Sequence, residues 1–191
     1  MPELADLTWP RRTERLTLRP TVEADFPAIW EIRRLEEASR WMTDLSDDWD
    51  EFAERLRDPA RLAATLTLEL DGVLVGDLML RFEDPWAQGE VKDQAVGAGA
   101  EIGWCLDPAQ GGHGYATEAA AELLRIAFED LGMHRVTALC FAANEPSWRL
   151  MERIGMRREG YHVKDSLHRE LGWVDGLTYA LLAEEWASRA G

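Results

Sequence analysis

The segment from residue 100 to residue 131 constrains the fold most, because it joins an apolar run, a glycine-rich turn and a helical pattern without interruption. Residues 100–106 (AEIGWCL) predict a short strand rich in large apolar side chains. Residues 107–114 carry a proline and three glycines, which is typical of a turn. Residues 115–131 contain strong helix formers with apolar residues at helical spacing, and Gly132 favours an end there.

A glycine-rich turn that leads into a helix can bind a phosphate. Without Cβ atoms the backbone N–H groups can converge, and the helix N-terminus adds positive partial charge. Two common nucleotide motifs are excluded by the residues themselves. A Walker loop needs a lysine before the helix, whereas this chain has Gly114-Tyr115-Ala116-Thr117, and the fingerprint GxGxxG would need a glycine in place of Thr117.

The turn resembles the acyl-CoA loop of the GNAT superfamily of N-acyltransferases. The family pattern is Gln/Arg-x-x-Gly-x-Gly/Ala after a strand, and Gly114-Tyr115-Ala116 matches its second half. The run GHGYATEAA is similar in particular to the RimJ/RimL-type branch, which includes ribosomal-protein N-terminal acetyltransferases. The chain departs from the pattern at Gly111, which stands at the Gln/Arg position with Gln110 one residue early. The alternative is an ordinary strand–turn–helix connection, against which three glycines in four positions argue.

The resemblance implies acetyl-CoA as the acyl donor, with its pyrophosphate on the loop and its pantetheine arm along the preceding strand. The run NEPSWRLMERIGM also resembles the family's Asn-x-x-Ser helix start, whose side chains contact the arm or the thiol. In this segment a helix cap is the alternative role, and both roles can hold at once. The implied cofactor-binding residues are Trp104, Cys105, Leu106, Gly112, His113, Gly114, Tyr115, Ala116, Thr117, Asn144 and Ser147.

Two residues are candidates for the chemistry of acyl transfer. An amine must lose a proton before it attacks a thioester, which calls for a base. Glu101 is the first choice, because it lies in the predicted strand among apolar neighbours that would raise its pKa; a strand glutamate that faces solvent or caps a loop is the alternative. The resemblance implies Ser147 as the proton donor to the leaving thiolate. Met151 occupies the position where many GNAT enzymes carry a tyrosine acid, which leaves Ser147 or a water as donor.

The remaining segments predict further strands and helices in a mixed order. About a dozen residues at the start indicate a loose lead. Strands are predicted at residues 14–20, 62–71, 73–82, 100–106, 134–142, 156–163 and 177–182, and helices at 22–37 (capped by Thr21), 49–57, 115–131 and 144–154. This order predicts one α/β domain over residues 1–191, with a core of about 14–186 and a mixed sheet of about seven strands with helices on both faces. The GNAT resemblance implies the same element order.

Composition excludes several classes of protein. A net charge of −15 disfavours a nucleic-acid partner. The absence of a long apolar run or a leader pattern indicates no membrane association and a cytoplasmic protein. Two cysteines and four scattered histidines favour neither a disulfide framework nor a metal site.

We therefore expect transfer of an acetyl group from acetyl-CoA to a primary amine, by direct attack in a ternary complex. The acceptor is a peptide or protein N-terminus or a small amine; an aminoglycoside or another amine metabolite is the alternative. A protein that binds acyl-CoA without turnover is a further alternative, which Gly111 and Met151 favour. The resemblance implies an acceptor pocket walled by residues 161–175, with Trp30, Trp41, Trp86 and Trp173 as candidate aromatic partners, although tryptophans more often belong to a core. It also implies a possible homodimer.

Overall fold

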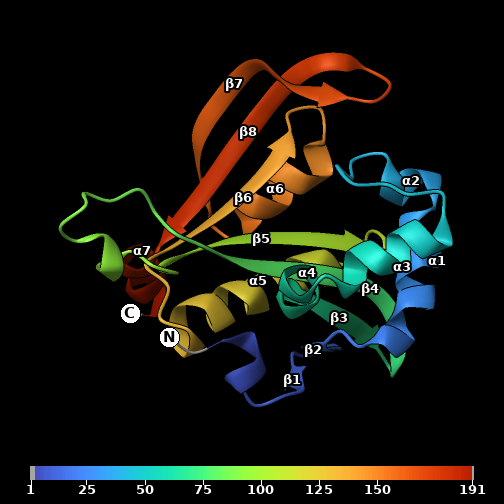
Figure 1. Ribbon diagram of the computed structural model, residues 1–191, viewed down its shortest axis with the longest axis horizontal. Coiled ribbons are helices and arrows are strands. Elements are labelled where there is room, and N and C mark those ends of the chain that lie inside the picture. Colours follow the sequence, from blue (N-terminus) through green and yellow to red (C-terminus); the bar gives the residue numbers. More distant parts are fainter. Residues whose placement is uncertain (1–2, 191) are drawn as a thin grey trace. The chain divides into compact units, whose positions relative to one another are not determined.

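The computed structural model describes residues 3–190, and the chain divides into two compact units. The first unit comprises Met1–Arg81 and Gly103–Leu123, and the second comprises Phe82–Ile102 and Leu124–Gly191. Hydrogen-bonded strands follow the order β1-β2-β3-β4-β5-β6-β8-β7 (Figure 1). The mixed α/β architecture predicted from the sequence is confirmed, with eight strands among residues 3–190 where about seven are predicted.

The first unit contains antiparallel strands that follow one another along the chain. They are β1 (Arg11–Arg12), β2 (Leu16–Pro20), β3 (Thr65–Leu70) and β4 (Val73–Glu83), whose last residues belong to the second unit. Leu18 pairs with Leu68, and both side chains are fully buried, so the apolar face of each strand fixes the register. Asp71 and Gly72 join β3 to β4 with positive φ angles, which confirms the predicted Asp-Gly hairpin.

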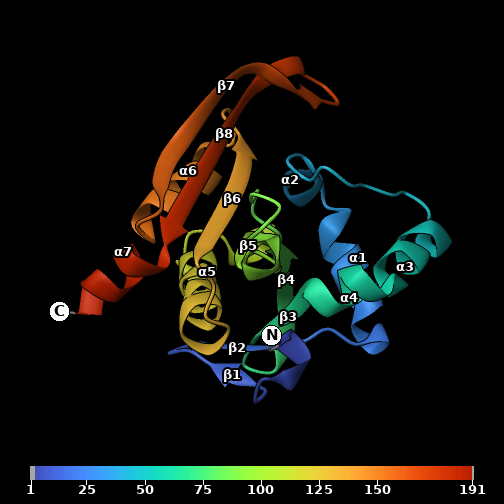
Figure 2. The ribbon, with the colours of Figure 1, turned by 60° about the vertical axis from the view of Figure 1, so that its left-hand side comes forward.

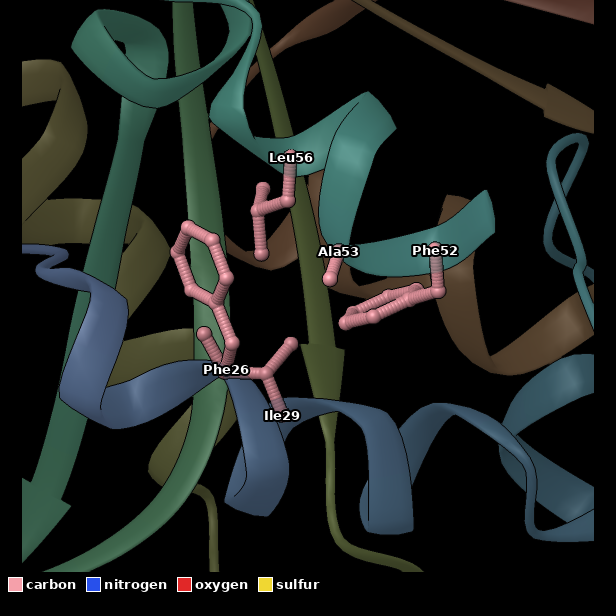
Figure 3. Packing of buried hydrophobic residues seen from close by; sticks show 5 residues of the cluster. All are labelled: Phe26, Ile29, Phe52, Ala53 and Leu56. Atoms are coloured by element: carbon pink, nitrogen blue, oxygen red, sulfur yellow. The ribbon is translucent and has the colours of Figure 1, made fainter. Parts of the chain in front are cut away.

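Between β2 and β3 lie four α-helices, α1 (Phe26–Arg33), α2 (Glu36–Ser39), α3 (Trp49–Arg57) and α4 (Pro59–Ala64). Two of them, α1 and α3, share a small apolar core. Phe26 and Ile29 of α1 meet Phe52, Ala53 and Leu56 of α3, and all five side chains are buried (Figure 3). Burial of such side chains stabilises a fold by about 1.5–3 kcal/mol each for the larger ones, which fixes α1 against α3.

The second unit holds the remaining part of the sheet. Strand β5 (Gly99–Leu106) begins in this unit and pairs in parallel with β6 (Arg135–Phe141) over its first residues. On its other side β6 pairs with β8 (Gly172–Leu182), which pairs with β7 (Arg157–His168), both in the antiparallel sense. Helix α6 (Glu145–Arg153) lies along these three strands in both views (Figures 1 and 2), and α7 (Ala183–Ala187) follows β8.

A helix and a π-helical turn connect the parallel strands β5 and β6. Helix α5 (Tyr115–Arg125) begins directly after the glycine-rich turn, as predicted. Its continuation, Ile126–Asp130, is π-helical, and the Leu131 N–H donates to the Ile126 carbonyl five residues earlier. Gly132 then ends the helical segment with a φ of +67°.

The helix predicted at residues 22–37 is shorter in the structure. A 3-10 turn at Glu23–Asp25 precedes α1, and an extended Leu35 separates α1 from α2. Thr21 does not cap the helix, because its buried hydroxyl is hydrogen-bonded to Thr67. The Asp25 carboxylate instead accepts from the Val22 N–H and fixes the turn.

Three other predictions also need correction. The start of the chain is not a loose lead, because Leu4 is buried in a 3-10 turn at Leu4–Asp6 and β1 follows. Residue 62 belongs to α4, because the Asp58 carboxylate caps that helix at its N–H groups and Pro59 stands at its first position. Strands β7 and β8 run further toward each other than predicted and form one long hairpin (Figure 1).

Candidate functional site

The glycine loop, residues 107–114, connects β5 to α5 in the first unit and is shaped by local hydrogen bonds. Asp107 accepts from the Ala109 N–H, and the Gly111 N–H donates to the Pro108 carbonyl at 2.9 Å. Gly112 and Gly114 have φ angles of +78° and +81°, a region that favours glycine. Nothing lies within 4 Å of where a Cβ on Gly112 would be. The loop is therefore open at the turn into the helix.

Backbone N–H groups of this turn are available to a ligand. The N–H groups of residues 112–117, which we call the N–H cradle, have no acceptor within residues 3–190. The helical hydrogen-bond ladder starts one residue later, where the Glu118 N–H donates to the Gly114 carbonyl at 3.0 Å. Free N–H groups at a helix N-terminus attract anions, because they can donate directly and the helix dipole adds positive partial charge. The geometry fits a phosphate-bearing ligand.

The end of β5, which carries Trp104, Cys105 and Leu106, packs closely against β4 in the first unit. A Cβ on Gly76 would lie 2.4 Å from the Cys105 carbonyl oxygen, so only glycine permits this approach. The Asp107 N–H donates to the Val75 carbonyl at 2.9 Å. Burial, reinforced by Asp77, raises the pKa of the Cys105 thiol to about 12. Cys105 therefore stays a neutral thiol and does not supply a thiolate.

A buried ion pair lies beside Cys105, and neither of its residues is among the site residues predicted from the sequence. Arg33 of α1 donates from Nε to Asp77 Oδ1 of β4 at 2.9 Å, and a second contact joins the same side chains. Burial works against the charge of Arg33, but Asp77 outweighs it and raises the pKa of the guanidinium above its ordinary value. The pair fixes α1 to the strand that supports β5. Its partners are 44 positions apart, so only the fold reveals the contact.

Glu101 lies on the part of β5 that belongs to the second unit. Its side chain is half-buried, and the residue is opposite Thr137 of β6 in the parallel register. The Thr137 hydroxyl donates to the Ala100 carbonyl at 3.3 Å and to Glu83 Oε2 at 3.4 Å. The residue opposite the predicted base thus carries a hydroxyl that also contacts a carboxylate.

Asn144 and Ser147 lie at the start of α6 in the second unit. The Ser147 N–H donates to the Asn144 carbonyl at 3.1 Å and to its side-chain Oδ1 at 3.4 Å, so Asn144 caps the helix. The Ser147 side chain is hydrogen-bonded to the Cys140 thiol on β6; this lowers the thiol pKa, but burial dominates and raises it to about 11. Cys140 is not among the site residues predicted from the sequence. Met151 is buried with 1% exposure and belongs to the core.

The residues expected to wall an acceptor pocket have diverse surroundings. Trp30 packs edge-on against Trp49 at 5.5 Å, which makes it part of the α1–α3 core. Trp86 is fully exposed and Trp173 is 59% exposed. In the β7–β8 hairpin the Tyr161 hydroxyl is hydrogen-bonded to Asp175, which raises the tyrosine pKa.

Sequence reasoning also misses a contact network behind the glycine loop. Arg15, on the connection from β1 to β2, forms an ion pair with Glu118 of α5 and donates to the His113 carbonyl. Thr13 donates its hydroxyl to the same carboxylate. The only sign of this network in the sequence itself is Glu118, an acidic residue in the first turn of the predicted helix.

Two kinds of feature are absent from the described part of the chain. None of the helices within residues 3–190 combines the length and the apolar composition that a membrane span requires. The same residues contain no group of three or more histidine, cysteine or acidic side chains placed to hold a metal ion.

Comparisons with known proteins agree with this geometry. The Acetyltransferase (GNAT) domain profile matches residues 15–157. The uncharacterized N-acetyltransferase YnaD of Bacillus subtilis (strain 168) is 44% identical over 86 residues, which are 45% of this chain and 50% of YnaD. The chain thus matches about half the length of this curated relative.

Solved structures match over a longer part of the chain. A GNAT-family acetyltransferase from Bacillus anthracis is 31% identical with a TM-score of 0.75, and the match covers 91% of this chain and 98% of that one. Mycobacterium smegmatis RimJ, solved in complex with CoA-disulfide, is 28% identical with a TM-score of 0.70, over 89% of this chain and 83% of RimJ. The profile match covers most of the chain and the structural matches extend it, so this protein belongs to the GNAT acetyltransferase family.

Proposed function

We propose that this protein is an acetyl-CoA-dependent N-acetyltransferase whose residues 1–191 act as a single catalytic domain. The observation that carries the proposal is the N–H cradle, residues 112–117, at the start of α5. Glycine at the turn leaves it open, and the helix start favours an anion. Family membership and the CoA-disulfide bound to RimJ support coenzyme A as that anion.

The residues present fit coenzyme A. His113, Tyr115, Ala116 and Thr117 would donate backbone N–H groups to the pyrophosphate together with the two glycines at 112 and 114. The β5 backbone from Trp104 to Leu106 would line the pantetheine arm, as would Asn144 and Ser147 at the start of α6. The bound donor supplies an activated thioester carbonyl to the acceptor amine.

Two side chains of this chain would handle the protons. Glu101 would accept a proton from the ammonium form of the acceptor, directly or through a water, because only the neutral amine has a free electron pair. Ser147 would donate its hydroxyl proton to the departing thiolate sulfur and regain a proton from solvent. The Cys140 thiol, neutral because burial raises its pKa to about 11, would hold the Ser147 side chain in place.

A peptide or protein N-terminus is the acceptor that we propose, because GHGYATEAA resembles the RimJ/RimL-type branch. The net charge of −15 favours cationic acceptors in general, since a negative surface attracts ammonium groups over distance. A small amine metabolite is the second candidate, favoured by the same charge.

The test measures thiol release from acetyl-CoA across a panel of peptides with free N-termini, polyamines and aminoglycosides. We expect turnover with at least one amine and a bell-shaped pH–rate profile. Glu101→Gln should flatten the acid limb of that profile and leave the affinity for CoA nearly unchanged. CoA binding without turnover on any amine would instead indicate a binding protein, and an unaltered acid limb would remove Glu101 as the base.

A further inference from the structure

The chain lacks a side chain at the loop position where its family carries glutamine or arginine. Gly111 stands there, and its N–H is already used by the Pro108 carbonyl. A guanidinium nevertheless reaches the loop from another part of the first unit. Arg15 precedes β2, and its Nη1 donates to the His113 carbonyl at 2.8 Å.

Arg15 is held in this position by several contacts. Its Nε and Nη2 atoms lie 2.7 Å and 2.6 Å from Glu118 Oε2, and its backbone N–H donates to Glu118 Oε1 at 2.9 Å. The guanidinium carbon lies 4.6 Å from the centre of the Tyr115 ring, and the His113 ring stacks on the same tyrosine with 5.4 Å between ring centres. Through these contacts the Arg15 side chain joins His113, before the helix, to Tyr115 and Glu118, in the first turn of α5.

Hydrogen bonding to His113 has a geometric consequence. In a trans peptide the C=O and the following N–H point in opposite directions. Because Arg15 holds the His113 carbonyl on one side, the N–H of Gly114 points to the other side, where it joins the cradle. Gly114 has room for this arrangement, since even a Cβ at this position would lie 3.6 Å from Arg15 Nη2, its nearest neighbour.

The ion pair has an electrostatic consequence. Glu118 stands in the first turn of α5, where a negative charge competes with a phosphate for the positive helix end. Hydrogen bonds from Thr13 and Arg15 outweigh burial and lower the Glu118 pKa, so the carboxylate is ionised. Arg15 balances that charge next to the cradle.

We propose that Arg15 is a positioning residue for the donor's phosphate: it orients the His113–Gly114 peptide and neutralises Glu118, and so replaces the side chain that Gly111 lacks. This inference rests on the proposed function. Thr13 supports the arrangement from the same connection, because its hydroxyl donates to Glu118.

The test is isothermal titration of CoA into the wild-type protein, Arg15→Ala, Glu118→Gln and the double variant. Arg15→Ala should weaken CoA binding roughly tenfold or more, since it removes a charge-assisted network. Glu118→Gln should not weaken it, and adding Glu118→Gln to Arg15→Ala should recover part of the loss, because the unbalanced carboxylate is gone. A merely structural role of Arg15 predicts no such recovery.

The matched control is Arg34→Ala, which removes an arginine paired with Glu31 and placed 4.5 Å from the Trp30 ring. It should leave CoA affinity unchanged. If Arg15→Ala fails to fold by thermal melt, Arg15→Lys replaces it: lysine keeps the charge but loses the planar fork, and weaker CoA binding supports the proposal. Wild-type affinity in the arginine variants overturns this inference alone, whereas a wild-type protein that binds no CoA overturns the proposed function and the inference with it.

Discussion

The substitution Gly114→Ala should change ligand binding by the loop more than it changes the stability of the protein. The φ of +81° costs a residue with a Cβ about 1–2 kcal/mol, and the less flexible unfolded chain returns about 0.4–1 kcal/mol. The nearest atom to the new Cβ would be Arg15 Nη2 at an ordinary 3.6 Å, so no steric cost adds to this. We expect a net loss of about 1 kcal/mol in unfolding free energy, which is about 2–4 °C in Tm for a chain of this size.

The same substitution should have a larger effect on ligand binding. Relief of the strained φ rotates the peptide that presents the Gly114 N–H, and the cradle loses a donor. We expect CoA affinity to fall about tenfold, which corresponds to about 1.4 kcal/mol. Gly114→Val should abolish binding, because its branched side chain disfavours the positive φ angle and would take up the space of the ligand in the cradle.

Gly132→Ala is the matched control for this prediction. Gly132 has a φ of +67° with nothing within 4 Å of its Cβ position, and it lies after the helical segment rather than before it. It should lose about the same stability as Gly114→Ala and keep its CoA affinity. Urea unfolding and isothermal titration measure the two quantities. Undiminished CoA binding by Gly114→Ala would refute the assignment of the loop.

Three further predictions concern other parts of the molecule. Ser147→Ala should lower kcat about a hundredfold, with little change in the KM for acetyl-CoA, if the hydroxyl is the proton donor; steady-state kinetics with an unchanged kcat would exclude this role. Asp77→Ala should cost about 3–5 kcal/mol of unfolding free energy in urea, because it leaves the charge of Arg33 buried without its partner; a loss below about 1 kcal/mol would show that water compensates. Hydrogen bonds from Arg135 lower the Glu159 pKa from 4.5 to about 2, so its contribution to stability is present above pH 4.5 and is lost as the pH falls through 2. Stability measured against pH should therefore fall less steeply on the acid side in Glu159→Gln, and parallel curves would contradict the ion pair.

Much of the fold could be predicted because its signals are local. The Asp71-Gly72 turn and the apolar runs on either side specify β3 and β4, and the strand–turn–helix pattern specifies β5 and α5. Strand β1 has only two residues, too few for a periodic pattern. Strand β7 is exposed along most of its length, so no alternation of buried and exposed residues marks its end at His168.

In the candidate site, too, local features could be predicted from the sequence and long-range contacts could not. Glycines at a turn act through their own backbone, so the loop from residue 107 to 114 could be identified in the sequence. Arg15 and Glu118 are 103 positions apart, and Arg33 and Asp77 are 44 apart, so neither pair leaves a trace in any local window. Cys140 lies in a strand as the sequence predicts, but its hydrogen bond to Ser147 depends on how α6 folds back onto β6.

A thermal melt with and without acetyl-CoA measures whether the N–H cradle belongs to a coenzyme A site. A ligand that binds only the native state at a hundredfold excess over its Kd adds about 2.7 kcal/mol of stability. For a chain of this size that corresponds to a rise in Tm of about 5–11 °C. We expect such a rise for the wild-type protein and a smaller one for Gly114→Ala at the same concentration. An unchanged Tm at saturating acetyl-CoA would contradict the N–H cradle as a coenzyme A site and every catalytic role that depends on it.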